Sequence, residues 1–241
     1  MNRRLLLLSN DDGLEAKGLR QLIAYLRDDY DLFVVAPDGQ RSAMSSCVTS
    51  GKEVRATMVS ASPALTEYLC SGTPADCVKL ALSCLMPQQP DLVIGGINHG
   101  SNAGLNALYS GTVGAAREGS LHGIPSLAFS LCDHDPDADF SPLRPYILGM
   151  TARALREGLP NGTCINVNFP VVAEYAGVLR CRMGRNIWVN EFAETSPGSF
   201  CLGGDNINME PDATDTDHWA LEHGYVAVTP VGWDSTDYTL L

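Results

Sequence analysis

The stretch Leu5-Leu6-Leu7-Leu8-Ser9-Asn10-Asp11-Asp12-Gly13 decides the fold class of this chain. Its four consecutive leucines form a short apolar run, which is typical of a strand buried on both faces. The run follows Met1-Asn2-Arg3-Arg4, but it is too short for the apolar region of a signal peptide, and charged residues follow at once. We therefore interpret the run as the first strand of a sheet, and two aspartates follow the end of this strand.

Apolar runs alternate with helical patterns through the first two thirds of the chain. Runs typical of buried strands lie at 32–36, 92–94, 126–131 and 164–168, and helical patterns lie at 19–26, 111–121, 143–157 and after Thr73-Pro74. Threonine is a good residue at a helix N-cap, and proline suits the first helical position. The alternation predicts an α/β fold, with a mostly parallel sheet and helices on both faces.

The pattern changes after Phe169. The remaining residues are rich in Gly, Asp, Thr and Asn, with short strand-like pieces at 178–181, 188–193 and 225–231. We expect residues 1–170 to form the core. We expect residues 171–241 to form a β-rich extension with hairpins and subunit contacts, which packs on the core and is not an independent domain.

The composition limits the classes of partner. The chain has 241 residues, of which 45% are hydrophobic and 18% charged, which argues against disorder and leaves ample material for a core. Its net charge is −12. Nucleic-acid binding relies on Lys and Arg that neutralise phosphates, so a polymeric anion is not an expected ligand. A small anion still binds where a metal ion and backbone amides supply local positive charge.

The cysteines point to a reducing compartment. The chain has 8 Cys, and no two are spaced as Cys-x-x-Cys. A chain of this size does not need a disulfide framework, so we expect a cytoplasmic protein with free thiols. No segment approaches the length of a membrane-spanning helix, and we expect no membrane partner.

The adjacent carboxylates Asp11 and Asp12 are the first candidate site. They follow a parallel strand directly, and open α/β sheets bind ligands at that edge. Adjacent carboxylates repel each other unless a cation lies between them, and hard oxygen ligands favour Mg²⁺, Mn²⁺ or Ca²⁺. The alternative is an ordinary solvated Asp-Asp-Gly turn, and the motif alone fits both.

Two polar segments follow other predicted strands. Residues 95–104 are rich in glycine, which lets a backbone approach an anion closely, and Asn98 offers a neutral oxygen as a third metal ligand. This segment is not a dinucleotide fingerprint, because no helix follows it at once. Residues 37–42 follow the second strand, where Ser42 offers a further oxygen and Arg41 a phosphate contact. Each segment alone also fits a polar surface loop.

A fourth segment opens a helix. Ser110, Gly111 and Thr112 stand where unpaired amides and the helix dipole favour an anion, although an ordinary N-cap has the same composition. Because strand ends in a parallel sheet share one edge, the four segments are able to converge. Together they offer carboxylates, an amide oxygen, a hydroxyl and an anion-binding backbone, which is the set that metal-assisted phosphate-ester hydrolysis requires.

These residues resemble the stationary-phase survival protein E (SurE) family of nucleotidases. The matching stretches are Leu-Leu-Ser-Asn-Asp-Asp-Gly at 7–13, Val-Ala-Pro-Asp at 35–38, Gly-Thr-Pro-Ala-Asp-Cys-Val at 72–78, Gly-Ile-Asn at 96–98, Tyr-Ser-Gly-Thr-Val-Gly-Ala-Ala-Arg-Glu-Gly at 109–119, Gly-Ile-Pro-Ser at 123–126 and Gly-Tyr-Val-Ala-Val-Thr-Pro at 224–230. The resemblance runs nearly end to end, and the first and fifth stretches are highly specific in combination.

The resemblance implies one divalent metal ion per subunit, Mg²⁺ or Mn²⁺, bound by Asp11, Asp12, Ser42 and Asn98. It also implies hydrolysis of nucleoside 5′- and 3′-monophosphates and, in some members, of short polyphosphate. The fold that it implies is a Rossmann-like core with a C-terminal extension that exchanges between the subunits of a homodimer or homotetramer.

The sequence departs from the family pattern at two places. Members often carry Asp-Pro-Arg-Gly and then a Tyr-Trp pair, where this chain has Thr195-Ser196-Pro197-Gly198 and then Phe200-Cys201. The segment Ala43 to Cys47 lacks the glycine that is common after the serine. These departures leave the implied metal ligands intact and concern base preference and subunit contacts.

The mechanism leaves alternatives open at this stage. We expect Asn98, Ser110, Gly111 and Thr112 to contact phosphate oxygens, with Asn10 as a further phosphate contact or a support for the ligands. Either aspartate is able to activate a water molecule or to attack phosphorus itself. Two other functions fit the same residues: a short-chain exopolyphosphatase, and a nucleotide- or phosphate-binding module without catalysis.

Overall fold

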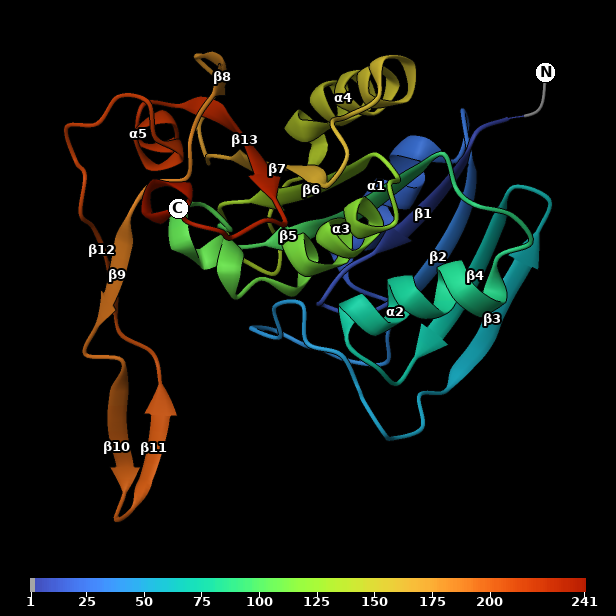
Figure 1. Cartoon of the computed structure of the whole chain (residues 1–241), viewed down its shortest axis with the longest axis horizontal. Coiled ribbons are helices and arrows are strands. Elements are labelled where there is room, and N and C mark those ends of the chain that lie inside the picture. The colour runs from blue at the N-terminus through green and yellow to red at the C-terminus, as the bar shows by residue number, and fades with distance from the viewer. Residues whose placement is uncertain (1–2) are drawn as a thin grey trace.

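A nine-stranded sheet forms the centre of the molecule in the computed structural model, which describes residues 3–241. Its strands are β1 (Leu5–Ser9), β2 (Asp31–Pro37), β3 (Ala56–Ser62), β4 (Leu65–Cys70), β5 (Leu92–His99), β6 (Ser126–Leu131), β7 (Thr163–Phe169), β8 (Gly177–Arg180) and β13 (Tyr225–Gly232). They are ordered β3-β4-β2-β1-β5-β6-β7-β13-β8 (Figure 1). The six strands from β4 to β7 are mutually parallel, which confirms the predicted mostly parallel sheet.

Helices cover both faces of this sheet, as the alternating pattern predicted. The α-helices are α1 (Lys17–Leu26), α2 (Pro74–Leu80), α3 (Gly111–Leu121), α4 (Arg144–Glu157) and α5 (Asp217–Glu222). Shorter helical segments are η1 (Ala81–Leu85), η2 (Gly104–Leu108), η3 (Ser141–Leu143) and η4 (Tyr238–Leu240). None of the helices in residues 3–241 combines the length and apolar character needed to cross a membrane.

The leucines of β1 divide the core into two layers. Side chains on a strand alternate between its faces, and all three leucines at positions 6, 7 and 8 are fully buried. Leu6 and Leu8 pack in one cluster with Leu19 and Leu22 of α1. Leu7 packs on the opposite face with residues of α2 and α3. Burial on both faces explains why the run contains no polar residue.

The chain reverses its direction of progress across the sheet beside β1. From β1 it proceeds to β2 and β4 on one side, and it then returns to place β5 on the other side of β1. The boundary between β1 and β5 is therefore the topological switch point, where open α/β sheets bind ligands beyond the carboxyl ends of the strands. Asp11 and Asp12 follow β1 at this place, and Asn98 lies near the end of β5.

Two features of the sheet differ from the sequence-based prediction. The strand expected at 92–94 continues as β5 to His99, so half of the expected glycine-rich loop is strand with an irregular register. The antiparallel hairpin of β3 and β4 was not indicated by the pattern. Six of the seven β3 residues are exposed, and such an edge strand has no apolar run to reveal it.

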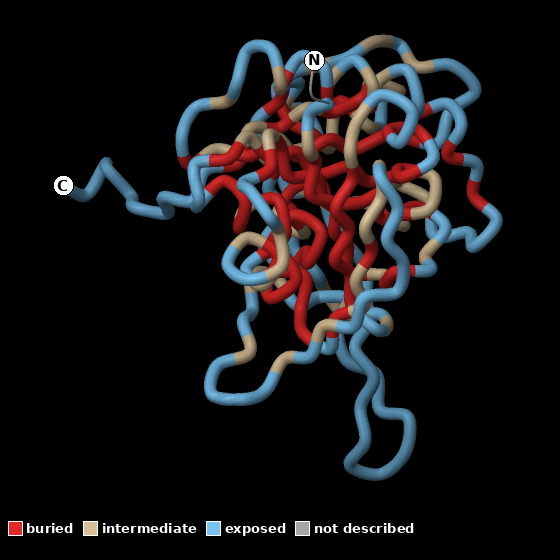
Figure 2. The backbone as a smooth tube through the Cα atoms, turned by 90° about the vertical axis from the view of Figure 1, so that its right-hand side faces the viewer, coloured by how far each residue is buried: buried red, intermediate tan, exposed pale blue. Residues whose placement is uncertain are grey.

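The residues after position 170 contribute to two structures. The strands β8 and β13 extend the main sheet. The strands β9 (Asn186–Val189), β10 (Phe192–Ser196), β11 (Ser199–Leu202) and β12 (Asp205–Asn208) form two small antiparallel sheets. These form an arm that projects from the body and is exposed along β10 and β11 (Figures 1 and 2). The expected division at residue 170 and the subunit contacts stay predictions.

The close approach of α1 to β5 gives a testable consequence. A Cβ atom on Gly18 would lie 1.9 Å from the Ile97 carbonyl oxygen. We expect Gly18→Ala to push α1 away from the sheet and to lower the free energy of unfolding by about 1–3 kcal/mol or more, as measured by urea denaturation.

Gly149 is the matched control, because it lies in α4, is exposed, and a Cβ there would meet nothing within 4 Å. Gly149→Ala is expected to raise stability by roughly 0.5–1 kcal/mol, since alanine loses less backbone entropy in a helix. Equal effects of the two substitutions would contradict the packing argument.

Candidate active site

The Asp11 carboxylate is buried at the start of helix α3. Its exposed fraction is 5%. The Thr112 hydroxyl donates a hydrogen bond to Oδ1 at 2.6 Å, and the Gly111 backbone N–H donates to Oδ2 at 3.1 Å. A carboxylate at a helix N-terminus also interacts favourably with the helix dipole. The side chain is therefore held in one orientation by the helix that it contacts.

Two glycines permit this close approach of α3 to the sheet. A Cβ atom on Gly111 would lie 2.8 Å from the Asp11 Cβ, and a Cβ atom on Gly95 in β5 would lie 2.3 Å from the Thr112 carbonyl oxygen. Ser110 starts the helix as its N-cap, because its Oγ accepts a hydrogen bond from the Val113 N–H at 3.1 Å. The predicted helix start at residues 110–112 is confirmed.

The two aspartates are unfavourable neighbours without a cation. The pKa of Asp11 is raised to about 6, mainly by burial and also by the negative charge of Asp12, although the hydrogen bond from Thr112 opposes the increase. Burial also raises the pKa of Asp12. Raised values mean that the charged carboxylates are poorly compensated by the protein alone, so the pair is suited to a bound cation.

Asp12 is the less restrained of the two carboxylates. It is partly exposed, and its only recorded hydrogen bond within the described residues is a long one, accepted from the His99 backbone N–H at 3.5 Å. This contact nevertheless places Asp12 against the end of β5. Asp12 is therefore close to Asn98 and remains free to contact a ligand.

Asn98 supplies a neutral oxygen at the same edge. Its Nδ2 donates to the carbonyls of Gly100 at 2.8 Å and His99 at 3.1 Å, and these two acceptors fix the orientation of the amide. No hydrogen bond within residues 3–241 reaches its Oδ1. The same residues contain no group of three His, Cys, Asp or Glu side chains that is able to hold a metal, so a metal here requires neutral oxygens such as this one.

The loop after β2 reaches the site through its backbone. The Arg41 N–H donates to the Asp11 carbonyl at 2.6 Å, and the Ser45 N–H and hydroxyl donate to the carbonyls of Tyr109 and Leu108 at 2.8 and 2.6 Å. Ser42 lies between these anchors in the sequence, is exposed, and makes no side-chain hydrogen bond within residues 3–241. The structure brings Ser42 near the aspartates, and its role as a ligand stays a prediction.

Several predicted phosphate contacts already have protein partners. Asn10 is fully buried, and both ends of its amide bond the Gly13 backbone, at 3.0 and 3.2 Å. Gly111 and Thr112 donate to Asp11, and Ser110 accepts from Val113. These residues therefore shape the loop and the carboxylate in this structure, and their contacts with phosphate stay predictions.

The sequence reasoning missed two buried asparagines at the carboxyl end of β7. Asn166 and Asn168 are both 0% exposed, and both contact Asn102 in the segment after β5. Their alternate spacing on an otherwise apolar strand, in Cys-Ile-Asn-Val-Asn-Phe at 164–169, was the signal that could have revealed them.

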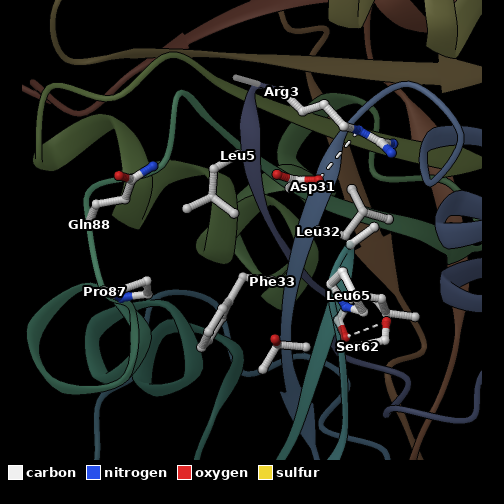
Figure 3. Close-up of a pocket in the computed structure, with 12 residues that line it drawn as sticks. Arg3, Leu5, Asp31, Leu32, Phe33, Ser62, Leu65, Pro87 and Gln88 are labelled. Atoms are coloured by element: carbon white, nitrogen blue, oxygen red, sulfur yellow. Dashed lines mark hydrogen bonds and ion pairs between the residues drawn. The ribbon is translucent and has the colours of Figure 1, made fainter. Parts of the chain in front are cut away.

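Two hollows lie elsewhere on the molecule. One, of about 380 Å³, lies at the amino ends of β1 and β2, where Arg3 and Asp31 form an ion pair at 3.4 Å. Figure 3 shows the side chains that line it. A second, of about 600 Å³, lies between α4 and the strands β7 and β13. The first is at the opposite edge from the aspartates, and the second is lined by none of the predicted site residues.

Substitutions of Thr112 test whether its hydroxyl stabilises the Asp11 carboxylate; we call its hydrogen bond and that of the Gly111 N–H the Asp11 clamp. Thr112→Val keeps the side-chain volume but removes the donor, and losing a hydrogen bond to a buried charged group is expected to cost about 1–3 kcal/mol. Thr112→Ser keeps the hydroxyl and is expected to cost only about 1 kcal/mol for the lost methyl group. Urea unfolding of the metal-free protein, above the raised pKa of Asp11, measures both. A serine variant less stable than the valine variant would contradict the clamp.

The chain is similar over most of its length to known proteins of one family. The family model described as "Survival protein SurE" matches residues 6–190. The 5′-nucleotidase SurE of Phocaeicola vulgatus is 51% identical over 98% of this chain and 94% of its own length. That of Bacteroides thetaiotaomicron is 47% identical over 97% and 92%.

The same similarity is found among solved structures. The crystal structure of the SurE protein from Aquifex aeolicus superposes with a TM-score of 0.82 at 33% identity, and the match covers 98% of this chain and 96% of that one. The fold and the resemblance predicted from the sequence are thus both confirmed. A family match over most of the chain and relatives this similar lead to one conclusion: the chain belongs to the survival protein SurE family.

Proposed function

We propose that this chain is a metal-dependent phosphomonoesterase that hydrolyses nucleoside 5′-monophosphates, and also 3′-monophosphates, to nucleoside and phosphate. The observation that carries the proposal is the Asp11 carboxylate, clamped by α3 at the switch point of the sheet beside Asp12 and Asn98. The relatives named 5′-nucleotidase SurE support the choice of substrate.

The residues at this edge fit one divalent ion, Mg²⁺ or Mn²⁺, per subunit. Asp11, Asp12, Asn98 and Ser42 offer two carboxylates, an amide oxygen and a hydroxyl, and hard cations prefer such oxygen ligands. The raised pKa values of the two aspartates support this assignment, because a cation would compensate both charges. When bound, the ion would neutralise phosphate charge and lower the pKa of a bound water.

The two aspartates have different roles in this proposal. Both oxygens of Asp11 already accept hydrogen bonds from α3, so Asp11 acts as a fixed ligand. Asp12 has only the long contact with His99, so it is free to orient a water molecule and to take its proton. A carboxylate within hydrogen-bond reach of the attacking water is able to act as its general base.

The phosphate group would lie against the first turn of α3. Ser110, Gly111 and Thr112 place the positive end of the helix dipole at this point, and we expect Asn98 to contact the same phosphate group. Asn10 supports the loop through Gly13. The overall negative charge disfavours polymeric anions and leaves this local field to attract a small phosphate ester.

The proposal also covers the cellular compartment and the oligomeric state of the protein. Eight free cysteines support a reducing cytoplasm. The projecting arm of β9 to β12 exposes Phe192, Phe200 and Leu202, which supports a homodimer or homotetramer, because apolar side chains gathered on an arm favour burial in a subunit contact.

Phosphate release from AMP and GMP tests the proposal. With Mn²⁺ or Mg²⁺ we expect turnover that EDTA abolishes and added metal restores. We expect Asp12→Asn to lower kcat by at least about a hundredfold, the scale on which a general base contributes. Asp91→Asn is the control, since Asp91 pairs with Arg4 at the opposite edge of the sheet.

The same assay separates the other two functions. Metal-loaded protein that binds nucleotide but releases no phosphate above the Asp12→Asn background would be a binding module. Faster release from short polyphosphate than from any nucleoside monophosphate would make nucleotide hydrolysis incidental.

Hydrolysis in heavy-oxygen water tests for an aspartate that attacks phosphorus and is then released by water at its carboxyl carbon. In a single turnover of AMP we expect the label in the released phosphate and none in the protein, because Asp12 activates water and does not attack phosphorus. Mass spectrometry of the peptide that contains residues 11 and 12 measures this. Label in that peptide would favour an aspartyl-phosphate instead.

A further inference from the structure

Two asparagines on one face of β7 form hydrogen bonds with the segment that follows β5. The Asn102 backbone N–H donates to Oδ1 of Asn168 at 2.8 Å, and Nδ2 of Asn166 donates to the Asn102 carbonyl at 2.8 Å. Residues two apart on a strand point to the same face, so the pair holds both backbone groups of a single residue. Asn102 itself is 7% exposed.

The stability of the fold does not explain why asparagine stands at positions 166 and 168. The two contacts fix the amide orientations, since Asn168 must present oxygen to an N–H and Asn166 must present nitrogen to a carbonyl. The remaining ends, Oδ1 of Asn166 and Nδ2 of Asn168, are buried and have no partner among the described residues. Unpaired buried amide groups destabilise a fold. Apolar side chains, such as that of Val167 between them, would avoid this cost.

The segment that these asparagines bind directly follows Asn98, the candidate metal ligand. The Gly100 N–H donates to the Leu131 carbonyl at 2.8 Å, and the Gly100 carbonyl accepts from Nδ2 of Asn98 at 2.8 Å. Nδ2 of Asn102 donates to the Ser130 hydroxyl at 2.9 Å. The segment is thus fixed at its middle and at its end, and its middle sets the orientation of the Asn98 amide.

We propose that Asn166 and Asn168 are positioning residues of the metal site. They fix the backbone of residues 98–102 and so keep the Asn98 oxygen in one orientation beside the two aspartates. This inference rests on the proposed function, because it takes Asn98 to be a metal ligand. It assigns a role to residues that touch neither substrate nor metal and act only through the segment.

Mn²⁺ binding to the metal-free full-length chain, measured by titration calorimetry, tests the proposal without relying on turnover. We expect Asn166→Ala and Asn168→Ala each to raise the Kd for Mn²⁺ about tenfold, the scale on which residues that orient metal ligands act. Val167→Ala is the matched control: it lies between them, is fully buried and packs in the core on the other face of β7. It should lower Tm but change the Kd for Mn²⁺ by no more than about twofold from the wild-type value. The reason is that Val167 shares no partner with the segment after β5, and sites without shared partners act independently.

Aspartate variants give a second test with side chains of nearly unchanged shape. Asn168→Asp keeps an acceptor for the Asn102 N–H, so it should bind Mn²⁺ more tightly than Asn168→Ala. Asn166→Asp puts an acceptor opposite the Asn102 carbonyl, so it should bind at least as weakly as Asn166→Ala. If the alanine variants do not fold, a weaker Kd for Asn166→Asp than for Asn168→Asp is the expected result.

The failures of the inference and of the proposed function are distinguishable. A wild-type chain that binds Mn²⁺ and hydrolyses AMP, with asparagine variants that bind Mn²⁺ equally well, would overturn the positioning role alone. Equal weakening by Val167→Ala would overturn it too. A wild-type chain that binds no Mn²⁺ would overturn the metal site and this inference together.

Discussion

A buried carboxylate joins the first strand of the sheet to a helix that begins one hundred residues later. Asp11 accepts from the Thr112 hydroxyl and the Gly111 N–H, and burial alone would make its charge costly. The bonds to the helix hold the charge in place, and the raised pKa of about 6 shows that they do not fully compensate it. The rest of the site is arranged around this incompletely compensated charge.

Short side chains make the arrangement possible. Glycines at positions 95 and 111 let α3 approach both β5 and Asp11, while the loop after β2 binds the Asp11 backbone through Arg41. The strands on either side of the switch point thus deliver a fixed carboxylate, a freer carboxylate and an oriented amide to one place.

The sequence was informative where one residue type has one physical role. The leucines of β1, the capping Thr73 and the adjacent aspartates were recognised because burial, capping and charge repulsion are local properties. The glycines of β5 were interpreted as part of a loop. Only the packed structure shows that Gly95 must lack a Cβ atom, because the Thr112 carbonyl oxygen occupies that space. Asn166 and Asn168 were overlooked because their partner lies in a segment more than sixty residues away. Ser42 is near the site, but its coordination remains a prediction.

The position of a bound cation tests the proposed metal site most directly. An anomalous difference map from a crystal grown with Mn²⁺ locates the ion without any assumption about activity. We expect an ion coordinated by side-chain oxygens of Asp11, Asp12 and Asn98, at the first turn of α3. An ion found only elsewhere, for example among the aspartates between Asp133 and Asp139, would contradict it.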